Sequence, residues 1–259
     1  QSEEQGIIIA TQNQGIFRFE PNGTSRVYAP SFRDKLVSAL HISGNVMLVG
    51  TQDGLYYYEM NEDNEEEPLA IEELAFIKIQ TIADAYGGRS FWIGTEDEGL
   101  FLLTITDDAF TIRKMGTESG LGFENIQDIA YDSDSNLILC SFLSGQITLN
   151  LNKGTQPEIL SVRSINSENG LTTNFVKCVY VDHEKNTWLG TYGNGISMQT
   201  NQFLRFYEYD GSGFGNSVYS ISMNDSMMWL GGDKEILYVD RQTDEYSLLY
   251  SYITIHVGN

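Results

Sequence analysis

The sequence is short of basic residues and of long apolar runs. Its 259 residues hold 15 lysines and arginines against 36 acidic residues, so the formal net charge is −21 at pH 7. Negative charge repels phosphate backbones and anionic headgroups, which argues against nucleic acid and membrane surfaces as partners. No stretch approaches the roughly 20 apolar residues of a membrane span, so we expect no membrane insertion within the chain.

Motifs of metal, phosphate and nucleophile chemistry are also missing. The sequence has no H-E-x-x-H, C-x-x-C, P-loop or G-x-S-x-G motif. We expect its three histidines, His41, His183 and His256, to lie in different repeats and too far apart to share a metal ion. The sequence therefore predicts no metal site, no cofactor and no catalytic residues.

Cysteine is scarce as well. Cys140 and Cys178 lie in apolar segments of neighbouring repeats, and the pattern favours two buried free thiols. A disulfide in an exported protein is the alternative, and it requires Cα atoms within about 7 Å of each other.

What the sequence does contain is a phrase repeated six times. Each copy has an apolar run, a small residue, a polar turn that usually includes glycine, and a second apolar run, which is typical of a β-hairpin. The copies span residues 7–17, 47–57, 91–101, 138–148, 187–197 and 228–237. The small residues are Ala10, Gly50, Gly94, Cys140, Gly190 and Gly231, at intervals of 40, 44, 46, 50 and 41. A strand-rich period in the forties predicts the blades of a propeller.

Further segments complete each repeat. An apolar segment precedes the hairpin, as at 37–42 and 176–182, and a more polar one follows it, as at 110–115 and 158–164. A complete repeat therefore has four strands, A to D, which is one propeller blade. With 41% hydrophobic residues the chain can bury a sizeable core. We expect an all-β protein, with residues 1–259 forming a single propeller domain.

The two ends of the chain complement each other. The first repeat lacks its A strand, and the last repeat is followed by an extra apolar stretch at residues 253–257. If this C-terminal strand pairs with the N-terminal hairpin, at residues 7–11, the ring closes as six blades and its exposed edges disappear. The alternative is that residues 253–257 open a seventh blade.

Three segments carry a family resemblance. Residues 171–191 read LTTNFVKCVYVDHEKNTWLGT, and 119–141 and 90–101 repeat parts of the pattern. The order Gly-Leu, Asn, an apolar strand ending in Asp, a polar turn and Trp-Ile/Leu-Gly-Thr resembles the two-component regulator propeller repeat. The chain departs from it in that tryptophan fills its place only at Trp92, Trp188 and Trp229.

The resemblance implies a function that the spacing itself does not show. Proteins with this repeat form the ligand-sensing extracytoplasmic regions of bacterial hybrid two-component systems. It implies a periplasmic or extracellular location, an oligosaccharide ligand, and neighbouring signalling domains or a second protomer as partners. Relatives usually carry seven blades per propeller.

The expected binding face is the one where the D–A and B–C loops of a propeller emerge. Aromatic rings next to amides and carboxylates, as these loops carry, are suited to stacking on sugars and bonding their hydroxyls. The B–C turns include Phe142 and Gln52. The predicted ligand-binding residues are Phe32, Arg33, Asp53, Glu96, Phe123, Asn125, Asn174, Phe175, Tyr192, Asn194, Phe214 and Asn216.

Other functions remain as alternatives. A polysaccharide hydrolase or lyase would need two carboxylates about 5 to 9 Å apart, which Glu96, Asp97 and Glu98 could supply. A protein-binding scaffold would present a large exposed aromatic patch. The turn from Asp132 to Asn136 resembles half of a calcium loop, but Asp and Asn also stabilise turns by bonding their own backbone, and that interpretation is favoured.

Overall fold

The computed structural model describes most of the chain as strands joined by short turns. The residues it describes are 7–11, 14–19, 25–60, 67–85, 89–106, 109–116, 125–132, 135–152, 154, 156–200, 204–207, 217–224, 226–232, 235–240 and 246–250. The chain divides into two compact units, which are described separately. Unit 1 comprises residues 1–126 and 153–156, and unit 2 comprises residues 127–152 and 157–259.

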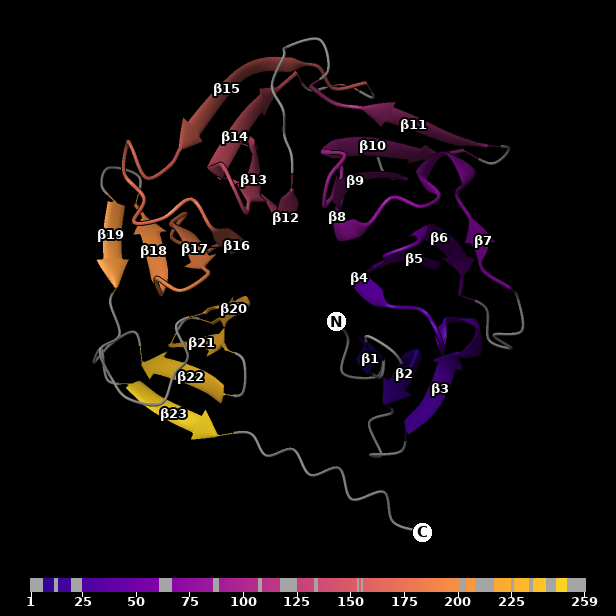
Figure 1. The fold of residues 1–259 in the computed structure, drawn as a ribbon, viewed down its shortest axis with the longest axis horizontal. Coiled ribbons are helices and arrows are strands. Elements are labelled where there is room, and N and C mark those ends of the chain that lie inside the picture. The colour runs from indigo at the N-terminus through magenta and orange to yellow at the C-terminus, as the bar shows by residue number, and fades with distance from the viewer. Residues whose placement is uncertain are drawn as a thin grey trace. The chain divides into compact units, whose positions relative to one another are not determined.

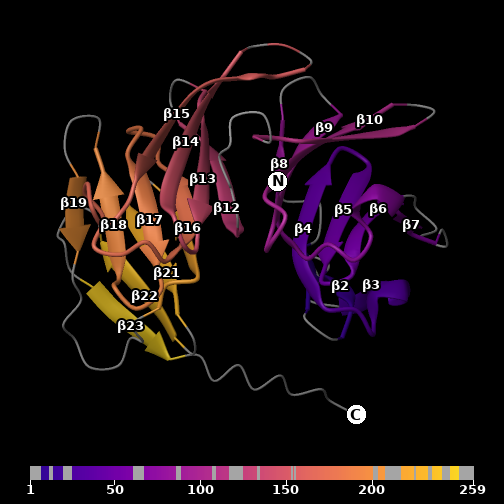
Figure 2. The same cartoon turned by 45° about the horizontal axis from the view of Figure 1, so that its top comes forward.

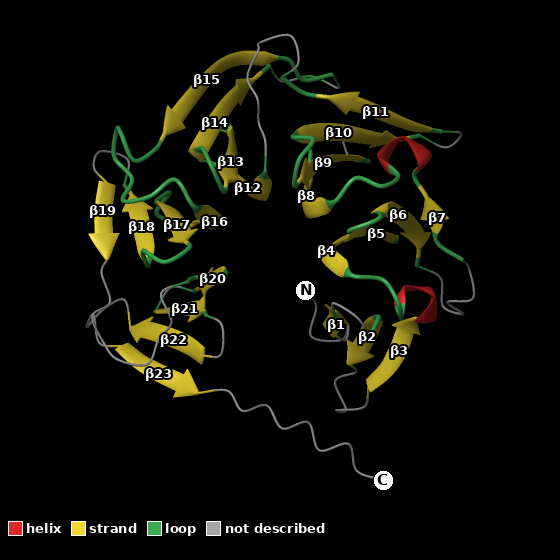
Figure 3. Ribbon diagram, viewed as in Figure 1, coloured by secondary structure: helices red, strands yellow, loops and turns green. Residues whose placement is uncertain are grey.

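Unit 1 contains three antiparallel sheets (Figure 1). Sheet 1 has β1 (Ile7–Ala10), β2 (Ile16–Phe19) and β3 (Ser25–Ala29). Sheet 2 has β4 (Val37–Ser43), β5 (Val46–Thr51), β6 (Gly54–Glu59) and β7 (Leu69–Ala70). Sheet 3 has β8 (Ile79–Asp84), β9 (Ser90–Thr95), β10 (Leu100–Ile105) and β11 (Phe110–Lys114). Two 3₁₀ helices, η1 (Pro30–Phe32) and η2 (Glu72–Leu74), lie in the connections that lead to sheets 2 and 3 (Figure 3).

Unit 2 contains three four-stranded sheets, with the first residue of β12 at the boundary with unit 1. Sheet 4 has β12 (Ile126–Tyr131), β13 (Leu137–Ser141), β14 (Gly145–Leu151) and β15 (Ile159–Ile165). Sheet 5 has β16 (Val176–Val181), β17 (Thr187–Thr191), β18 (Ile196–Gln199) and β19 (Leu204–Tyr207). Sheet 6 has β20 (Ser220–Met223), β21 (Met227–Gly231), β22 (Glu235–Asp240) and β23 (Tyr246–Tyr250). Figure 2 shows these sheets side by side, and β16 lies next to both β13 and β20.

The four-stranded repeat predicted from the sequence is confirmed. In sheets 2 to 6 the strands neighbour one another in chain order, A to D, as in a propeller blade. Sheet 1 has three described strands and lacks the A strand, as expected. Residues 253–257, which are predicted to supply that strand, lie outside the described residues, so ring closure stays a prediction. The expectation of one domain over residues 1–259 also stays a prediction.

The core of each unit lies between neighbouring sheets and is built by the central strands. Successive residues of β5 alternate between the two faces: Leu48 packs toward sheet 3, and Met47 and Val49 pack toward sheet 1. In unit 2, Cys140 packs between sheets 4 and 5, and Trp188 packs between sheets 5 and 6. A strand buried on both faces reads as a continuous apolar run, which explains the run in each hairpin.

Glycine at the small-residue position leaves no room for a side chain, as Gly50 and Gly190 show. A Cβ atom at Gly50 would lie 2.5 Å from Ile79 Cγ2, and one at Gly190 would lie 2.4 Å from Cys178 Sγ and 3.0 Å from Val218 Cγ1. Both distances of about 2.5 Å are far inside van der Waals contact. Ile79, the first residue of β8, occupies the space that a side chain at Gly50 would need. At Gly190 that space is taken by Cys178 of the same sheet and by Val218, just ahead of β20.

The residue after the small one closes the B–C turn. The Thr51 hydroxyl donates to the Gly54 carbonyl at 3.0 Å and accepts the Asp53 N–H at 3.1 Å. Thr95 and Thr191 make the same bond to the carbonyls of Gly99 and Gly195, at 2.8 and 2.7 Å. The Gly-Thr pair thus fixes both the packing between sheets and the shape of the turn that emerges from them.

The two cysteines are buried free thiols, which confirms the favoured interpretation. Burial raises the pKa of the Cys178 thiol to about 12, with a further contribution from the negative charge of Asp128. Burial likewise raises the pKa of the Cys140 thiol well above its ordinary value. Cys178 lies opposite Gly190 where β16 pairs with β17. Cys140 belongs to the cluster between sheets 4 and 5, which also contains Val176.

Replacing Gly50 by alanine is expected to lower the free energy of unfolding by about 1–3 kcal/mol, because the added methyl group overlaps Ile79. Denaturant unfolding monitored by circular dichroism would measure it. Gly154→Ala is the matched control, since its nearest neighbour atom is 4.0 Å from the new Cβ. Equal losses in the two variants would contradict the packing role of Gly50.

The buried thiols predict a loss of stability at alkaline pH. Above pH about 9 the cysteines of the unfolded chain lose their protons while the folded thiols keep theirs, so the unfolding free energy falls as pH rises toward 12. Each thiol contributes a slope of about 1.4 kcal/mol per pH unit. Urea unfolding from pH 7 to 11 should show a shallower decline for Cys140→Ala/Cys178→Ala. Parallel pH profiles for the two proteins would refute this explanation.

Candidate functional site

The two kinds of loop that were predicted to share a face are hydrogen-bonded to each other. In each case the residue after the turn threonine donates its N–H to the carbonyl of the residue before the A strand. Gln52 donates to Leu36 at 3.2 Å, Glu96 to Lys78 at 3.0 Å and Tyr192 to Phe175 at 2.9 Å. The B–C turn and the preceding D–A connection of sheets 2, 3 and 5 therefore form one edge.

In unit 2 this edge carries a continuous set of aromatic rings, Phe142, Phe175, Tyr192 and Tyr219, which we call the aromatic surface. The ring centroids of Phe142 and Phe175 are 5.1 Å apart, and those of Phe142 and Tyr192 are 5.9 Å apart. Tyr192 continues the set to Tyr219 at 6.5 Å. Phe175, Tyr192 and Tyr219 are 41%, 47% and 40% exposed, so the rings contact one another and still face solvent.

A lysine adds positive charge to the aromatic surface. Lys177 Nζ lies 4.9 Å from the centroid of the Phe142 ring, a cation–π distance. The same ammonium group donates to Gln127 Oε1 at 2.8 Å, which holds it over the ring. The site thus combines flat apolar faces with a fixed hydrogen-bond donor.

The loop that presents Phe175 is held by its own hydrogen bonds. Asn174 Oδ1 accepts the Ser167 N–H at 2.7 Å, and the Asn174 carbonyl accepts the N–H of Gly145 in the neighbouring turn at 3.0 Å. The Phe175 N–H donates to Thr173 Oγ1 at 3.2 Å. On the other side, Tyr192 forms a backbone bridge with Ser217 ahead of sheet 6. The rings are therefore presented on a preorganised backbone.

The fold does not require aromatic residues at these places. The residue after the small–Thr/Ser pair is Phe142 in sheet 4 and Tyr192 in sheet 5, whereas it is Gln52 in sheet 2 and Glu96 in sheet 3. Blades of the same construction therefore form with polar side chains at this position. The aromatic surface is a property of unit 2 rather than a packing requirement of the repeat.

The predicted site residues are distributed over both units. The structure joins Phe175 to Tyr192, with Asn194 exposed in the same turn and Asn174 engaged in holding the loop. In unit 1, Arg33 and Asp53 are exposed, and Asn125 is half-buried with a left-handed φ of 58°. Phe123, Phe214 and Asn216 lie outside the described residues.

One predicted ligand contact is corrected by the structure. Phe32 is fully buried at the end of η1, within the cluster between sheets 1 and 2. Its ring packs edge-on against Tyr56 with centroids 5.5 Å apart. Burying a phenyl ring in this gap is more favourable than exposing it, so Phe32 belongs to the core.

Tyr219 and Lys177 were missed by the sequence reasoning. Both occupy the second position of an A strand segment, directly after the apolar residues Val218 and Val176. An alignment of the five A segments at this position would have shown Ser38, Gln80 and Gln127 in the other three. The signal was therefore present in the register of the repeats.

The acidic turn proposed for catalysis is occupied by ion pairs. Glu96 Oε2 lies 2.9 Å from Lys78 Nζ, and Glu98 Oε2 lies 2.7 Å from Lys114 Nζ. The hydrogen bond and charge of Glu96 raise the pKa of the Lys78 ammonium. These carboxylates lie in unit 1, and the residues of the aromatic surface include no carboxylate.

The Asp–Asn turns stabilise the A–B connections, as favoured over calcium binding. Asp132 Oδ1 accepts the Asn136 N–H at 2.8 Å, and Asp182 Oδ1 accepts the Asn186 N–H at the same distance. Asp182 Oδ2 also accepts Trp188 Nε1–H at 2.8 Å, which ties the tryptophan of the repeat to its turn.

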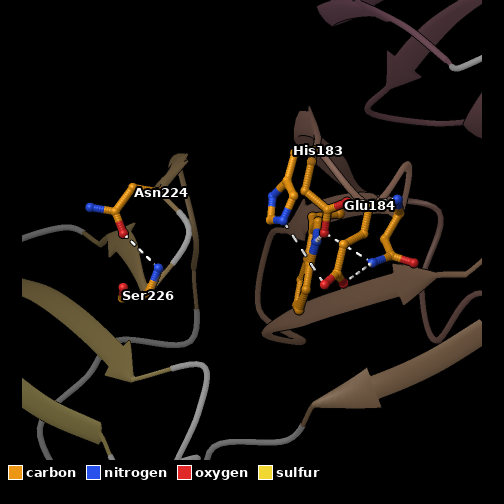
Figure 4. Close-up of polar contacts among 7 residues, drawn as sticks. His183, Glu184, Asn224 and Ser226 are labelled. Atoms are coloured by element: carbon orange, nitrogen blue, oxygen red, sulfur yellow. Dashed lines mark hydrogen bonds and ion pairs between the residues drawn. The ribbon is translucent and has the colours of Figure 1, made fainter.

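Figure 4 shows the A–B turns of sheets 5 and 6, which lie at the other end of the strands from the aromatic surface. His183 Nε2 lies 4.0 Å from Glu184 Oε1, and Asn224 Oδ1 accepts the Ser226 N–H at 3.0 Å. His41 Nε2, in unit 1, lies 3.0 Å from Asp84 Oδ1.

Within the described part of the chain, no three His, Cys, Asp or Glu side chains gather as metal ligands. The helices in the same part of the chain are not long and apolar enough to cross a bilayer.

A family model matches the segment that builds half of the aromatic surface. Residues 170–193 match the two component regulator propeller. The segment begins before Phe175, continues through β16 and β17 and ends just after Tyr192. None of the curated protein sequences matches the chain.

Solved structures share the fold at low sequence identity. The extracellular domain assigned to the hybrid two component system BT3049 of B. thetaiotaomicron aligns over 95% of the chain, with a TM-score of 0.76 and 19% identity. PorZ, a surface component of the type-IX secretion system of Porphyromonas gingivalis, aligns over 90% with a TM-score of 0.68 and 14% identity. The chain spans 33% and 37% of those two proteins.

A third similar structure is that of YCF48 bound to D1 peptide. It aligns over 95% of the chain and 77% of its own length, with a TM-score of 0.65 and 10% identity. At these identities the comparisons show a propeller fold.

Proposed function

Because the chain is a β-propeller that carries the two component regulator propeller repeat, we propose that it is the ligand-sensing part of an extracytoplasmic signalling protein. The observation that supports binding most directly is the aromatic surface of unit 2. Three of its rings are at least 40% exposed although each contacts a neighbouring ring. Exposed aromatic groups on a preorganised backbone are characteristic of recognition sites.

The proposed ligand is an oligosaccharide. The apolar C–H face of a sugar ring stacks on an exposed aromatic ring, and its hydroxyls need donors and acceptors nearby. Lys177 and the exposed Asn194 supply such groups beside Phe142 and Tyr192. Rings from three neighbouring sheets favour a ligand of several sugar units over a monosaccharide.

The signal would be a shift in population between arrangements of the sheets. Phe142 belongs to sheet 4, Phe175 and Tyr192 to sheet 5, and Tyr219 to the start of sheet 6. A ligand that contacts all three sheets stabilises the arrangement in which its contacts are best satisfied. Neighbouring domains or a second protomer would respond to that shift. The free energy available for the response is at most the difference in ligand-binding free energy between the two arrangements.

Two other functions are alternatives to oligosaccharide sensing. YCF48, of the same fold, is described with a bound peptide, and aromatic rings also suit peptides, so a peptide scaffold is the main alternative. A polysaccharide hydrolase or lyase needs a carboxylate pair at the site. The carboxylates proposed for that role, Glu96 and Glu98, are paired with lysines in unit 1.

Titration calorimetry of the full chain against a panel of neutral and acidic oligosaccharides tests the proposal. At least one glycan of the panel is expected to bind, and Phe175→Ala/Tyr192→Ala is expected to weaken its affinity at least tenfold, about 1.4 kcal/mol, because two stacking faces are lost. Leu160→Ala, on the exposed side of β15, is the matched control and should leave the affinity unchanged.

The competing functions give different results in the same experiment. Unchanged glycan affinity in the double variant, with normal thermal unfolding, would contradict binding at the aromatic surface. Affinity of the aromatic surface for extended peptides in place of glycans would support the scaffold. Release of new reducing ends from a polysaccharide would support the enzyme.

A further inference from the structure

The most exposed large apolar side chain among the described residues lies in unit 1, separate from the aromatic surface of unit 2. Phe76, in the connection from β7 to β8, is 91% exposed. Its backbone has a left-handed φ of 63°, a conformation that bulky L-residues rarely adopt. An outlier of this kind is a reason to look for a function.

Phe76 does not pack the gap between its sheets. The corresponding connection from sheet 1 to sheet 2 ends its 3₁₀ helix with Phe32, which is fully buried. In the connection to sheet 3, η2 ends with Leu74, and Leu74 is fully buried in the core between sheets 2 and 3. Leu74 therefore takes the packing role, and Phe76 lies two residues beyond it.

The backbone around Phe76 is fixed by hydrogen bonds on both sides of the B–C turn of sheet 2. The Phe76 N–H donates to the Asp53 carbonyl at 2.9 Å, and the Gln52 N–H donates to the Leu36 carbonyl at 3.2 Å. The turn itself is closed by Thr51. The exposed residues Gln52 and Asp53 are therefore bonded through their backbones to two residues with exposed apolar side chains, Leu36 and Phe76.

We propose that Leu36, Gln52, Asp53 and Phe76, which we call the unit 1 ledge, form a second carbohydrate-binding site. A sugar ring would stack on Phe76, and its hydroxyls would bond the Asp53 carboxylate and the Gln52 amide. This is the pairing of one flat apolar face with adjacent polar groups that sugars require. The site is separate from the aromatic surface, and it does not depend on ligand binding there.

The charge around the ledge specifies a neutral glycan. The exposed carboxylates of Glu72 and Glu73 belong to η2, immediately before Phe76, and Asp53 lies within the ledge. An anionic sugar would meet like charges on both sides, in a chain whose formal net charge is −21. A neutral oligosaccharide meets no such repulsion, and its hydroxyls can bond the carboxylate of Asp53 and the amide of Gln52.

Saturation-transfer difference NMR on the full chain tests the ledge, with cello-, malto-, xylo- and mannohexaose as neutral probes and a galacturonate hexamer as the acidic probe. At least one neutral hexamer is expected to receive saturation from the wild-type chain and to bind Phe76→Ala at least fivefold more weakly. The signal should persist in Phe175→Ala/Tyr192→Ala. Leu69→Ala, at another exposed position of unit 1, is the control and should retain it.

A second variant separates binding from folding. Phe76→Asn should lose the same signal while its thermal midpoint stays equal to or above that of the wild type, because asparagine tolerates a left-handed φ better than phenylalanine does. A lower midpoint would show a structural role for Phe76 and overturn the proposal.

The remaining outcomes are equally decisive. Equal saturation transfer to wild type and Phe76→Ala, stronger binding of the acidic hexamer, or Phe76-dependent binding of a basic peptide with no glycan signal would each overturn the ledge as a sugar site. A signal lost only in Phe175→Ala/Tyr192→Ala would support the aromatic surface alone. A signal lost only in Phe76→Ala would support the ledge alone.

Discussion

The structure depends on the close approach of one sheet to the next at the small residue of each hairpin. Ile79, at the start of β8, fills the space where a side chain at Gly50 would lie, and Val218, just ahead of β20, does so at Gly190 together with Cys178. This contact sets the spacing between sheets, and it buries both faces of the central strands. The threonine beside each glycine then fixes the turn that emerges from the packed region. Four of the six hairpins therefore have glycine at this place, because a single added methyl group would overlap its neighbour.

The same constraint leaves the loop edge free to vary. The backbone bond from the residue after threonine to the residue before the A strand involves no side chain, so it is the same for Gln52, Glu96 and Tyr192. One construction can therefore present an amide, an ion pair or an aromatic ring at equivalent places. In unit 2 these places carry the aromatic surface, and in unit 1 they carry polar groups next to Phe76. We infer that ligand specificity in this chain resides in side chains that the packing of the sheets does not select.

The errors of the sequence prediction follow from this difference between the packed hairpins and the variable loop edge. Phe32 and Phe175 both precede an A strand in a polar connection, and both were predicted to contact ligand. The structure buries Phe32 and exposes Phe175, because η1 turns the ring of Phe32 into the gap between sheets 1 and 2. Phe76, by contrast, is exposed but was not among the predicted ligand contacts. Its apolar neighbours suggest a core segment, whereas Leu74 fills that core and Phe76, with a left-handed φ, is exposed.

Sequence alone determined the repeat, the four strands of sheets 2 to 6, the positions of the turns and the buried state of both cysteines. These features follow from local rules, since apolar runs of strand length, glycine and threonine act within one hairpin or against the next. Only the tertiary structure decided which aromatic residues face solvent. Ring exposure depends on how a short connection folds against two sheets at once, and residues distant in sequence, such as Phe142, Phe175 and Tyr219, meet only when those sheets pack.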